Sequence, residues 1–78
     1  MPHVIVKLVS GKSEQQKKSL AEAITKSVTE ILNHGDDAVS VSFEEFQKQD
    51  WASEVYRPDI KAKWDSLYKK PGYDEKDL

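Results

Sequence analysis

The sequence contains no cysteine and only two histidines, His3 and His34. Disulfide bonds are therefore excluded, and no His/Cys cluster has the ligand spacing of a metal site. A chain of 78 residues buries only about 60–65% of the surface that its unfolded form exposes, so its core is small. Oligomerisation is then the remaining means of stabilisation. The lack of cysteine also fits a reducing cytoplasm, where we expect the protein to act.

Neither sign of charge dominates the composition. Twelve Lys and Arg residues stand against fourteen Asp and Glu residues, which gives a formal net charge of -2 at pH 7. Nucleic-acid binders normally carry a clustered basic face, so we expect no nucleic-acid partner. The longest apolar run is too short to span a membrane, and the start of the chain lacks the pattern of a signal peptide. Phosphate-loop, Rossmann and nucleophile-elbow motifs are also absent, so no cofactor is expected.

The first half of the chain has the pattern of a strand followed by a helix. Side chains alternate from His3 to Val9, which predicts a strand with one apolar face. Ser13 followed by Gln16 is a capping box, so we expect a helix to begin there. Asn33 to Gly35 should end the helix, because Asn and Gly tolerate the left-handed conformation. Between these limits runs an apolar stripe at helical spacing: Leu20, Ile24, Val28, Ile31 and Leu32.

A second strand is predicted around Val39 to Phe43, where apolar and polar side chains alternate with a period of two. The connection between the strands is roughly 30 residues long and contains one helix, which is the size of a β-α-β unit. We therefore expect the two strands to run parallel, with a right-handed crossover.

The sequence after Phe46 predicts further helix. Asp50 is a candidate cap for a short helix over Trp51 to Tyr56. Pro58 then either breaks that helix or begins a second one. Apolar residues at helical spacing would carry the second helix as far as Pro71-Gly72: Ile60, Trp64, Leu67 and Tyr68. The polar tail from Tyr73 to Leu78 is expected to be partly mobile, or ordered only by a partner subunit.

These elements predict one α/β domain over residues 1–78, which some schemes would class as α+β. Its centre is a single β-α-β unit with parallel strands, followed by a C-terminal helical segment. A two-stranded sheet alone is marginally stable in water, whereas two copies of the chain would provide four strands. We therefore expect oligomerisation to complete the sheet, with a homodimer as the smallest assembly.

Pro2 is the candidate for chemistry. An initiator methionine is normally removed when the next residue is small, and Pro2 would then carry a free secondary amine. A secondary amine is a base, whereas the nitrogen of an internal proline is an amide without basicity. Pro2 also precedes a strand directly, which would hold the amine at a sheet edge.

The order of these features resembles the 4-oxalocrotonate tautomerase family. The similar features are Met1-Pro2-His3 before a strand, the segment from Gly11 to Lys17, the long helix, and the alternating strand Val39–Phe43. The resemblance covers roughly residues 2 to 51. Beyond it, Trp64 and the segment Lys69 to Tyr73 resemble the slightly longer, dimeric bacterial branch. The resemblance implies a cofactor-independent isomerase in which the N-terminal proline moves a proton between oxygen and carbon of an enol.

The resemblance also implies roles for residues around Pro2. Lys12 stands where the family has an arginine that binds a substrate carboxylate, and lysine lacks the two-pronged guanidinium. Ser40 stands in place of a second arginine, which favours a monoacid over a dicarboxylate. Trp51 matches an aromatic residue beside the proline. Arg57 would either supply the missing charge or lie on the surface, and His3 is either a neighbour of the site or an exposed or interface residue.

Two functions remain open at this point. The first is a tautomerase acting on a small 2-hydroxy-alkenoate or aryl enolpyruvate, with related dehalogenation or hydration using the same proline. The second is an inactive β-α-β oligomerisation or binding module, which Lys12 and Ser40 in place of arginines favour. The mature N-terminus discriminates between them, because a retained Met1 would acylate Pro2.

Overall fold

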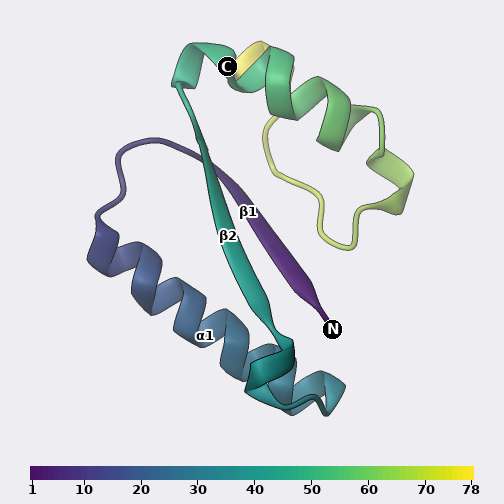
Figure 1. Cartoon of the computed structure of the whole chain (residues 1–78). Coiled ribbons are helices and arrows are strands. Elements are labelled where there is room, and N and C mark those ends of the chain that lie inside the picture. The colour runs from purple at the N-terminus through teal and green to yellow at the C-terminus, as the bar shows by residue number, and fades with distance from the viewer. The chain divides into compact units, whose positions relative to one another are not determined.

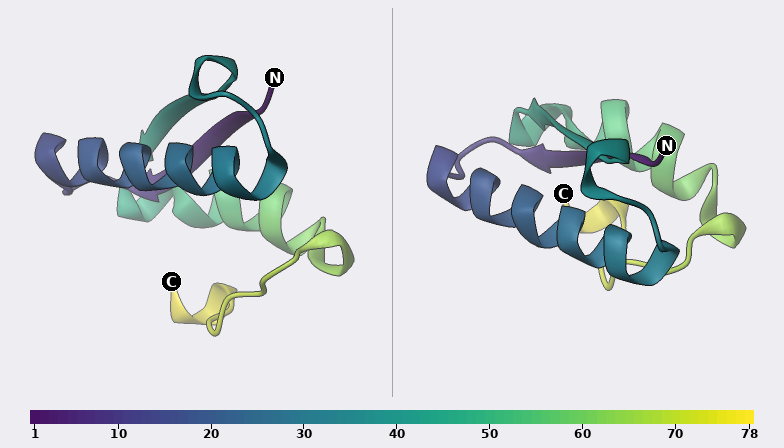
Figure 2. Two further views of the ribbon diagram at one scale, coloured as in Figure 1. Left: turned by 90° about the horizontal axis from the view of Figure 1, so that it is seen from below. Right: turned by 60° about the horizontal axis from the view of Figure 1, so that its bottom comes forward.

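Two strands and the helix between them form the first part of the chain. The computed structural model describes all residues from Met1 to Leu78, and the chain divides into two units, Met1–Glu45 and Phe46–Leu78. Strands β1 (His3–Val9) and β2 (Ser40–Phe46) pair in a parallel two-stranded sheet (Figure 1). Helix α1 (Glu14–Leu32) connects them through the short 3₁₀ turn η1 (Asp36–Ala38). Figure 2 shows α1 lying along one face of the sheet. The predicted β-α-β unit is confirmed.

The predicted ends of α1 are also confirmed. The Ser13 hydroxyl accepts a hydrogen bond from the Gln16 backbone N–H at 3.0 Å, and the Gln16 side-chain oxygen accepts one from the Ser13 N–H at 2.9 Å. This reciprocal pair satisfies two of the N–H groups that a helix start leaves free. At the other end Asn33 has φ 58°, the left-handed conformation expected of a residue that ends a helix.

An ion-pair network joins α1 to β2. The Lys17 ammonium lies 2.7 Å from a carboxylate oxygen of Glu45 on β2 and 2.7 Å from one of Glu14 on α1. These hydrogen bonds raise the pKa of Lys17, and the bond from Lys17 lowers the pKa of Glu14. Three charged side chains thus link the first turn of the helix to the end of the strand.

The chain by itself leaves much apolar surface uncovered. Only Val55 and Tyr56 are buried, and both belong to the second unit. In the first unit several large apolar side chains are exposed, with Ile31 at 76% and Leu32 at 54% of their full accessible surface. The apolar stripe of α1 is therefore wider than the two-stranded sheet can cover.

The second unit contains one ten-residue helix and short turns. Helix η3 (Ala52–Lys61) follows the 3₁₀ turn η2 (Lys48–Asp50) and is π-helical, as the hydrogen bond from Ala62 N–H to the Arg57 carbonyl over five residues illustrates. The expected cap at Asp50 is wrong, because Trp51 occupies the cap position without a side-chain hydrogen bond. A break or a new helix at Pro58 is wrong as well, since η3 continues through it.

The second helix predicted toward residue 70 is also wrong. After Lys61 the chain forms only the 3₁₀ turn η4 (Trp64–Ser66), and Leu67 is extended. The carbonyl of Lys63 accepts both the backbone N–H of Ser66 at 2.9 Å and its hydroxyl at 2.8 Å. This local pairing tightens the turn and competes with α-helical hydrogen bonding.

The C-terminal tail makes contacts within its own unit, which corrects the expectation of a partly mobile tail or one ordered only by a partner. Tyr73 accepts a 2.9 Å hydrogen bond from the Trp51 indole N–H, and the Tyr56 and Tyr73 rings lie 5.7 Å apart. Arg57 binds both carboxylate oxygens of Glu75, at 3.0 and 2.7 Å. The tail ends in the 3₁₀ turn η5 (Glu75–Asp77), capped by Asp74.

No helix in either unit is both long and apolar enough to cross a bilayer.

Substituting Ser13→Ala should destabilise the fold by about 1 kcal/mol, because it removes the oxygen that accepts the Gln16 N–H at the start of α1. Chemical denaturation at one fixed protein concentration measures the change. Ser27→Ala, in the exposed middle of the same helix, is the matched control and should cause no loss. Equal stability of the two variants would contradict the role of the cap.

Acidification should release the Arg57–Glu75 pair. The hydrogen bond from Arg57 lowers the pKa of Glu75 from its ordinary value of 4.5, so the pair stabilises the fold above that pH and is lost as the pH falls through the lowered pKa. A carboxyl-carbon NMR titration should place the Glu75 midpoint below 4.5. Arg57→Gln should raise this midpoint more than Lys61→Gln, since Lys61 contributes a weaker attraction. Equal effects of the two substitutions would contradict the assignment.

Candidate functional site

Pro2 lies where the two strands of the sheet begin. Its carbonyl accepts a hydrogen bond from the backbone N–H of Ser40, the first residue of β2, at 3.2 Å. Pro2 itself is half-buried, whereas Met1 is fully exposed. The residue that would carry the amine is therefore fixed by the sheet, and the methionine in front of it extends into solvent.

His3 and Ser40 meet directly beside Pro2. The His3 Nδ1 atom and the Ser40 hydroxyl oxygen are 2.7 Å apart, across the two strands. Both residues are exposed, and the Nε2 atom of His3 has no partner in the chain. Pro2, His3 and Ser40 thus form one group at the start of the sheet, which we call the strand-entry cluster.

Lys12 lies at the other end of β1. It is exposed in the loop between β1 and α1, next to Gly11, whose φ of +130° suits glycine. The seven residues of β1 separate it from Pro2, which corresponds to about 23 Å of extended chain. Figure 1 shows this loop and the N-terminus at opposite ends of the strand. Lys12 and Pro2 of one chain therefore cannot contact the same small molecule.

Trp51 and Arg57 belong to the second unit, and both have partners there. The indole N–H of Trp51 donates to Tyr73, and its ring meets Phe46 edge-on at a centroid distance of 6.1 Å. The N–H of Trp51 is therefore already engaged within the chain. The Arg57 guanidinium is bound at two points by Glu75, so its charge is compensated within the chain.

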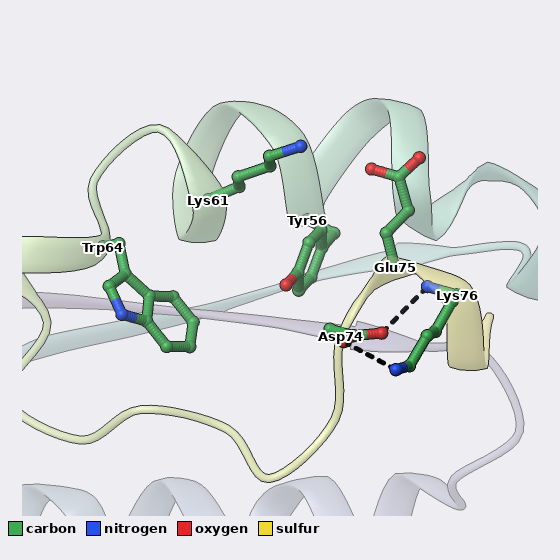
Figure 3. Close-up of a pocket in the computed structure, with 6 residues that line it drawn as sticks. All are labelled: Tyr56, Lys61, Trp64, Asp74, Glu75 and Lys76. Atoms are coloured by element: carbon green, nitrogen blue, oxygen red, sulfur yellow. Dashed lines mark hydrogen bonds and ion pairs between the residues drawn. The ribbon is translucent and has the colours of Figure 1, made fainter.

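The second unit also holds an open cavity of about 510 Å³ that sequence reasoning missed (Figure 3). Burial raises the pKa of the Tyr56 hydroxyl, and the nearby carboxylates of Asp74 and Glu75 act in the same direction. Tyr56 therefore stays protonated at neutral pH and is not a base. The lining residues are Tyr56, Lys61, Trp64, Asp74, Glu75 and Lys76.

The sequence contained one signal for this part of the structure. Asp74 followed by Asp77 has the spacing of a capping box, and both of its hydrogen bonds form. The Asp74 carboxylate accepts the Lys76 backbone N–H at 3.0 Å, and the Asp77 carboxylate accepts the Asp74 backbone N–H at 2.9 Å. The pattern would have indicated an ordered tail. It would not have indicated that Tyr73 and Glu75 bind Trp51 and Arg57.

Comparison with known proteins identifies a family model that matches residues 2–58, described as "Tautomerase enzyme". The match begins at Pro2 and includes the whole β-α-β unit together with Trp51 and Arg57.

Curated relatives match over most of their length and of this chain. A probable tautomerase of Xylella fastidiosa is 41% identical over 73 residues, which are 94% of this chain and 89% of the relative. The tautomerase PptA of Pectobacterium carotovorum subsp. carotovorum is 43% identical over 74 residues, which are 94% and 97% of the two chains. A solved structure of YwhB, a homologue of 4-oxalocrotonate tautomerase, superposes with a TM-score of 0.64 at 32% identity, covering 76% of this chain and 98% of that one.

Proposed function

Since the chain belongs to the tautomerase enzyme family and is therefore an isomerase, we propose that it converts enols to ketones with Pro2 as the proton-transferring group. The observation that carries the proposal is the hydrogen bond from the Ser40 N–H to the Pro2 carbonyl, which anchors the amine-bearing residue in the sheet. Catalysis by a base requires a fixed position relative to the substrate, and a mobile N-terminus would not provide one.

The proposed reaction needs only the transfer of a proton. Once Met1 is removed, the neutral amine of Pro2 takes the proton from the enol oxygen, and the resulting ammonium returns it to carbon. In a site closed to water, desolvation of the amine would disfavour its charged form, so that more of it would be neutral near pH 7. The two proton transfers balance without any electron transfer, so the proposal includes no cofactor.

We propose a small monocarboxylate enol, such as an aryl enolpyruvate, as the substrate. Lys12 is an exposed cation that can bind one carboxylate. A second carboxylate would lack a partner, because Ser40 is neutral and Arg57 is compensated by Glu75. The ring of Trp51 is proposed as an apolar wall for the aryl group.

A second copy of the chain is part of the proposal. Pro2 and Lys12 lie about 23 Å apart along β1, so they can serve one substrate only if they come from different chains. The exposed apolar side chains of α1 and the two-stranded sheet supply surface for such an assembly. A homodimer, the commonest symmetric assembly, would form two equivalent sites.

The first test is ketonisation of phenylenolpyruvate, followed by ultraviolet absorbance, with protein shown by intact mass to lack Met1. We expect a rate well above buffer. Pro2→Ala should lower kcat by about 100-fold or more, because the secondary amine is lost and a positioned acid–base group contributes that much. Pro71→Ala, which removes a proline from the second unit, is the control and should retain activity. No rate above buffer with a verified free Pro2 would reject this substrate class and favour a binding module.

A subunit-mixing experiment tests the assembly of the site. Pro2→Ala and Lys12→Gln should each have low activity alone, the latter through a raised KM. If every site combines Pro2 of one chain with Lys12 of another, unfolding and refolding the two variants together restores about a quarter of the wild-type sites. The control uses Lys18→Gln, on the exposed surface of α1, in place of Lys12→Gln. This variant should have the KM of the wild type. Mixing without any gain in activity would show that the two residues do not meet across chains.

A further inference from the structure

We infer that His3, held by Ser40 beside Pro2, is a second catalytic group whose Nε2 donates a hydrogen bond to the enol oxygen of the substrate. The inference rests on the proposed function, because it requires an enol whose proton Pro2 accepts. It goes beyond that function by assigning chemistry to the two other members of the strand-entry cluster.

The orientation of the His3 ring is fixed from one side. Ser40 lies 2.7 Å from Nδ1, and the backbone of Ser40 is itself bound to the Pro2 carbonyl at 3.2 Å. When the Ser40 hydroxyl donates to Nδ1, the ring proton of a neutral imidazole is on Nε2. In the imidazolium both nitrogens carry protons. Nε2 is a donor in both of these forms, and it has no partner within the chain. In the other neutral tautomer Nδ1 would donate to Ser40 and Nε2 would be an acceptor, so the inference assigns the arrangement in which Ser40 donates.

The position of Nε2 suits the reacting oxygen. The enol oxygen must lie about 2.6–3.2 Å from the Pro2 nitrogen to transfer its proton. His3 is the next residue, with its Cα about 3.8 Å from that of Pro2, and the inference requires its ring to reach the oxygen bound at the Pro2 nitrogen. Both residues are tied to Ser40, which limits their movement relative to each other.

A donor at this point stabilises the charge that develops during the reaction. The O–H bond of the enol breaks as the proton passes to the Pro2 amine, and negative charge grows on the oxygen. The electron pair of the C=C bond then takes the proton back from Pro2 at carbon, while the C=O bond forms. The His3 Nε2–H stays bonded to nitrogen throughout and donates most strongly to the charged oxygen.

The other charged candidates do not provide this contact. Lys12 of the same chain is at the far end of β1, and Arg57 is bound at two points by Glu75. Ser40 engages His3 through its hydroxyl. The open N–H of the strand-entry cluster is thus the imidazole of His3, a donor that adds no obligatory positive charge beside the Pro2 amine.

The test compares His3→Asn, His3→Gln and Ser40→Ala in protein with a free Pro2. The side-chain amide of asparagine takes the place of Nδ1 and can bond to Ser40, but it leaves no donor at the place of Nε2. The amide of the longer glutamine lies near the place of Nε2. On phenylenolpyruvate, His3→Asn should lower kcat by about 100-fold with little change in KM, and His3→Gln should retain more of the rate. Ser40→Ala should cause a smaller fall in kcat. Ser42→Ala, on the same strand, is the matched control and should behave as wild type.

The outcomes separate this inference from the proposed function. A wild-type rate that depends on Pro2, together with an unchanged kcat in His3→Asn, rejects the role of His3 alone. Equal losses of kcat and of the denaturation midpoint in both His3 variants would indicate a structural role and also reject it. A wild-type protein without ketonisation, or an active Pro2→Ala, rejects the proposed function, and the inference falls with it. A selective loss of kcat in His3→Asn with an unchanged denaturation midpoint supports it.

Discussion

Parallel pairing of β1 with β2 determines the position of each polar candidate in the first unit. Because the strands run in the same direction, the start of β1 lies beside the start of β2, and Ser40 meets both Pro2 and His3. The same geometry directs the loop with Lys12 to the opposite end of the sheet. An antiparallel pair would have placed Phe46, the last residue of β2, beside Pro2 and removed the hydroxyl from this cluster.

The size of the sheet sets a second limit. Two strands cannot cover the apolar stripe of a helix as long as α1, and Ile31 and Leu32 stay exposed as a result. In the second unit, by contrast, the tail folds back onto η3, with Tyr73 against Trp51 and Glu75 against Arg57. One unit thus closes on itself, while the other keeps open the surface that an assembly would need.

Local rules predicted the first unit well, because its strands, its capping box and its Asn33 stop depend on residues a few positions apart. The second unit could not be predicted in this way, since its contacts join Arg57 to Glu75 over 18 positions and Trp51 to Tyr73 over 22. The sequence predicted the candidate site only in part. The sequence identified Pro2, His3 and Ser40 one by one, but the contact between His3 and Ser40 spans 37 positions and depends on strand register. The expectation of one domain over residues 1–78 stays a prediction.

The proposed chemistry and the proposed assembly depend on each other. A Pro2 amine can act as a base near neutral pH only if its ammonium form is destabilised, either by desolvation or by a nearby cation. Within the first unit the support for either condition is limited, because Pro2 is only half-buried and Lys12 lies at the far end of β1. A second copy that covers the strand-entry cluster would remove water from the amine and bring its own Lys12 to the site. The contact that stabilises the fold would then also adjust the pKa of the base.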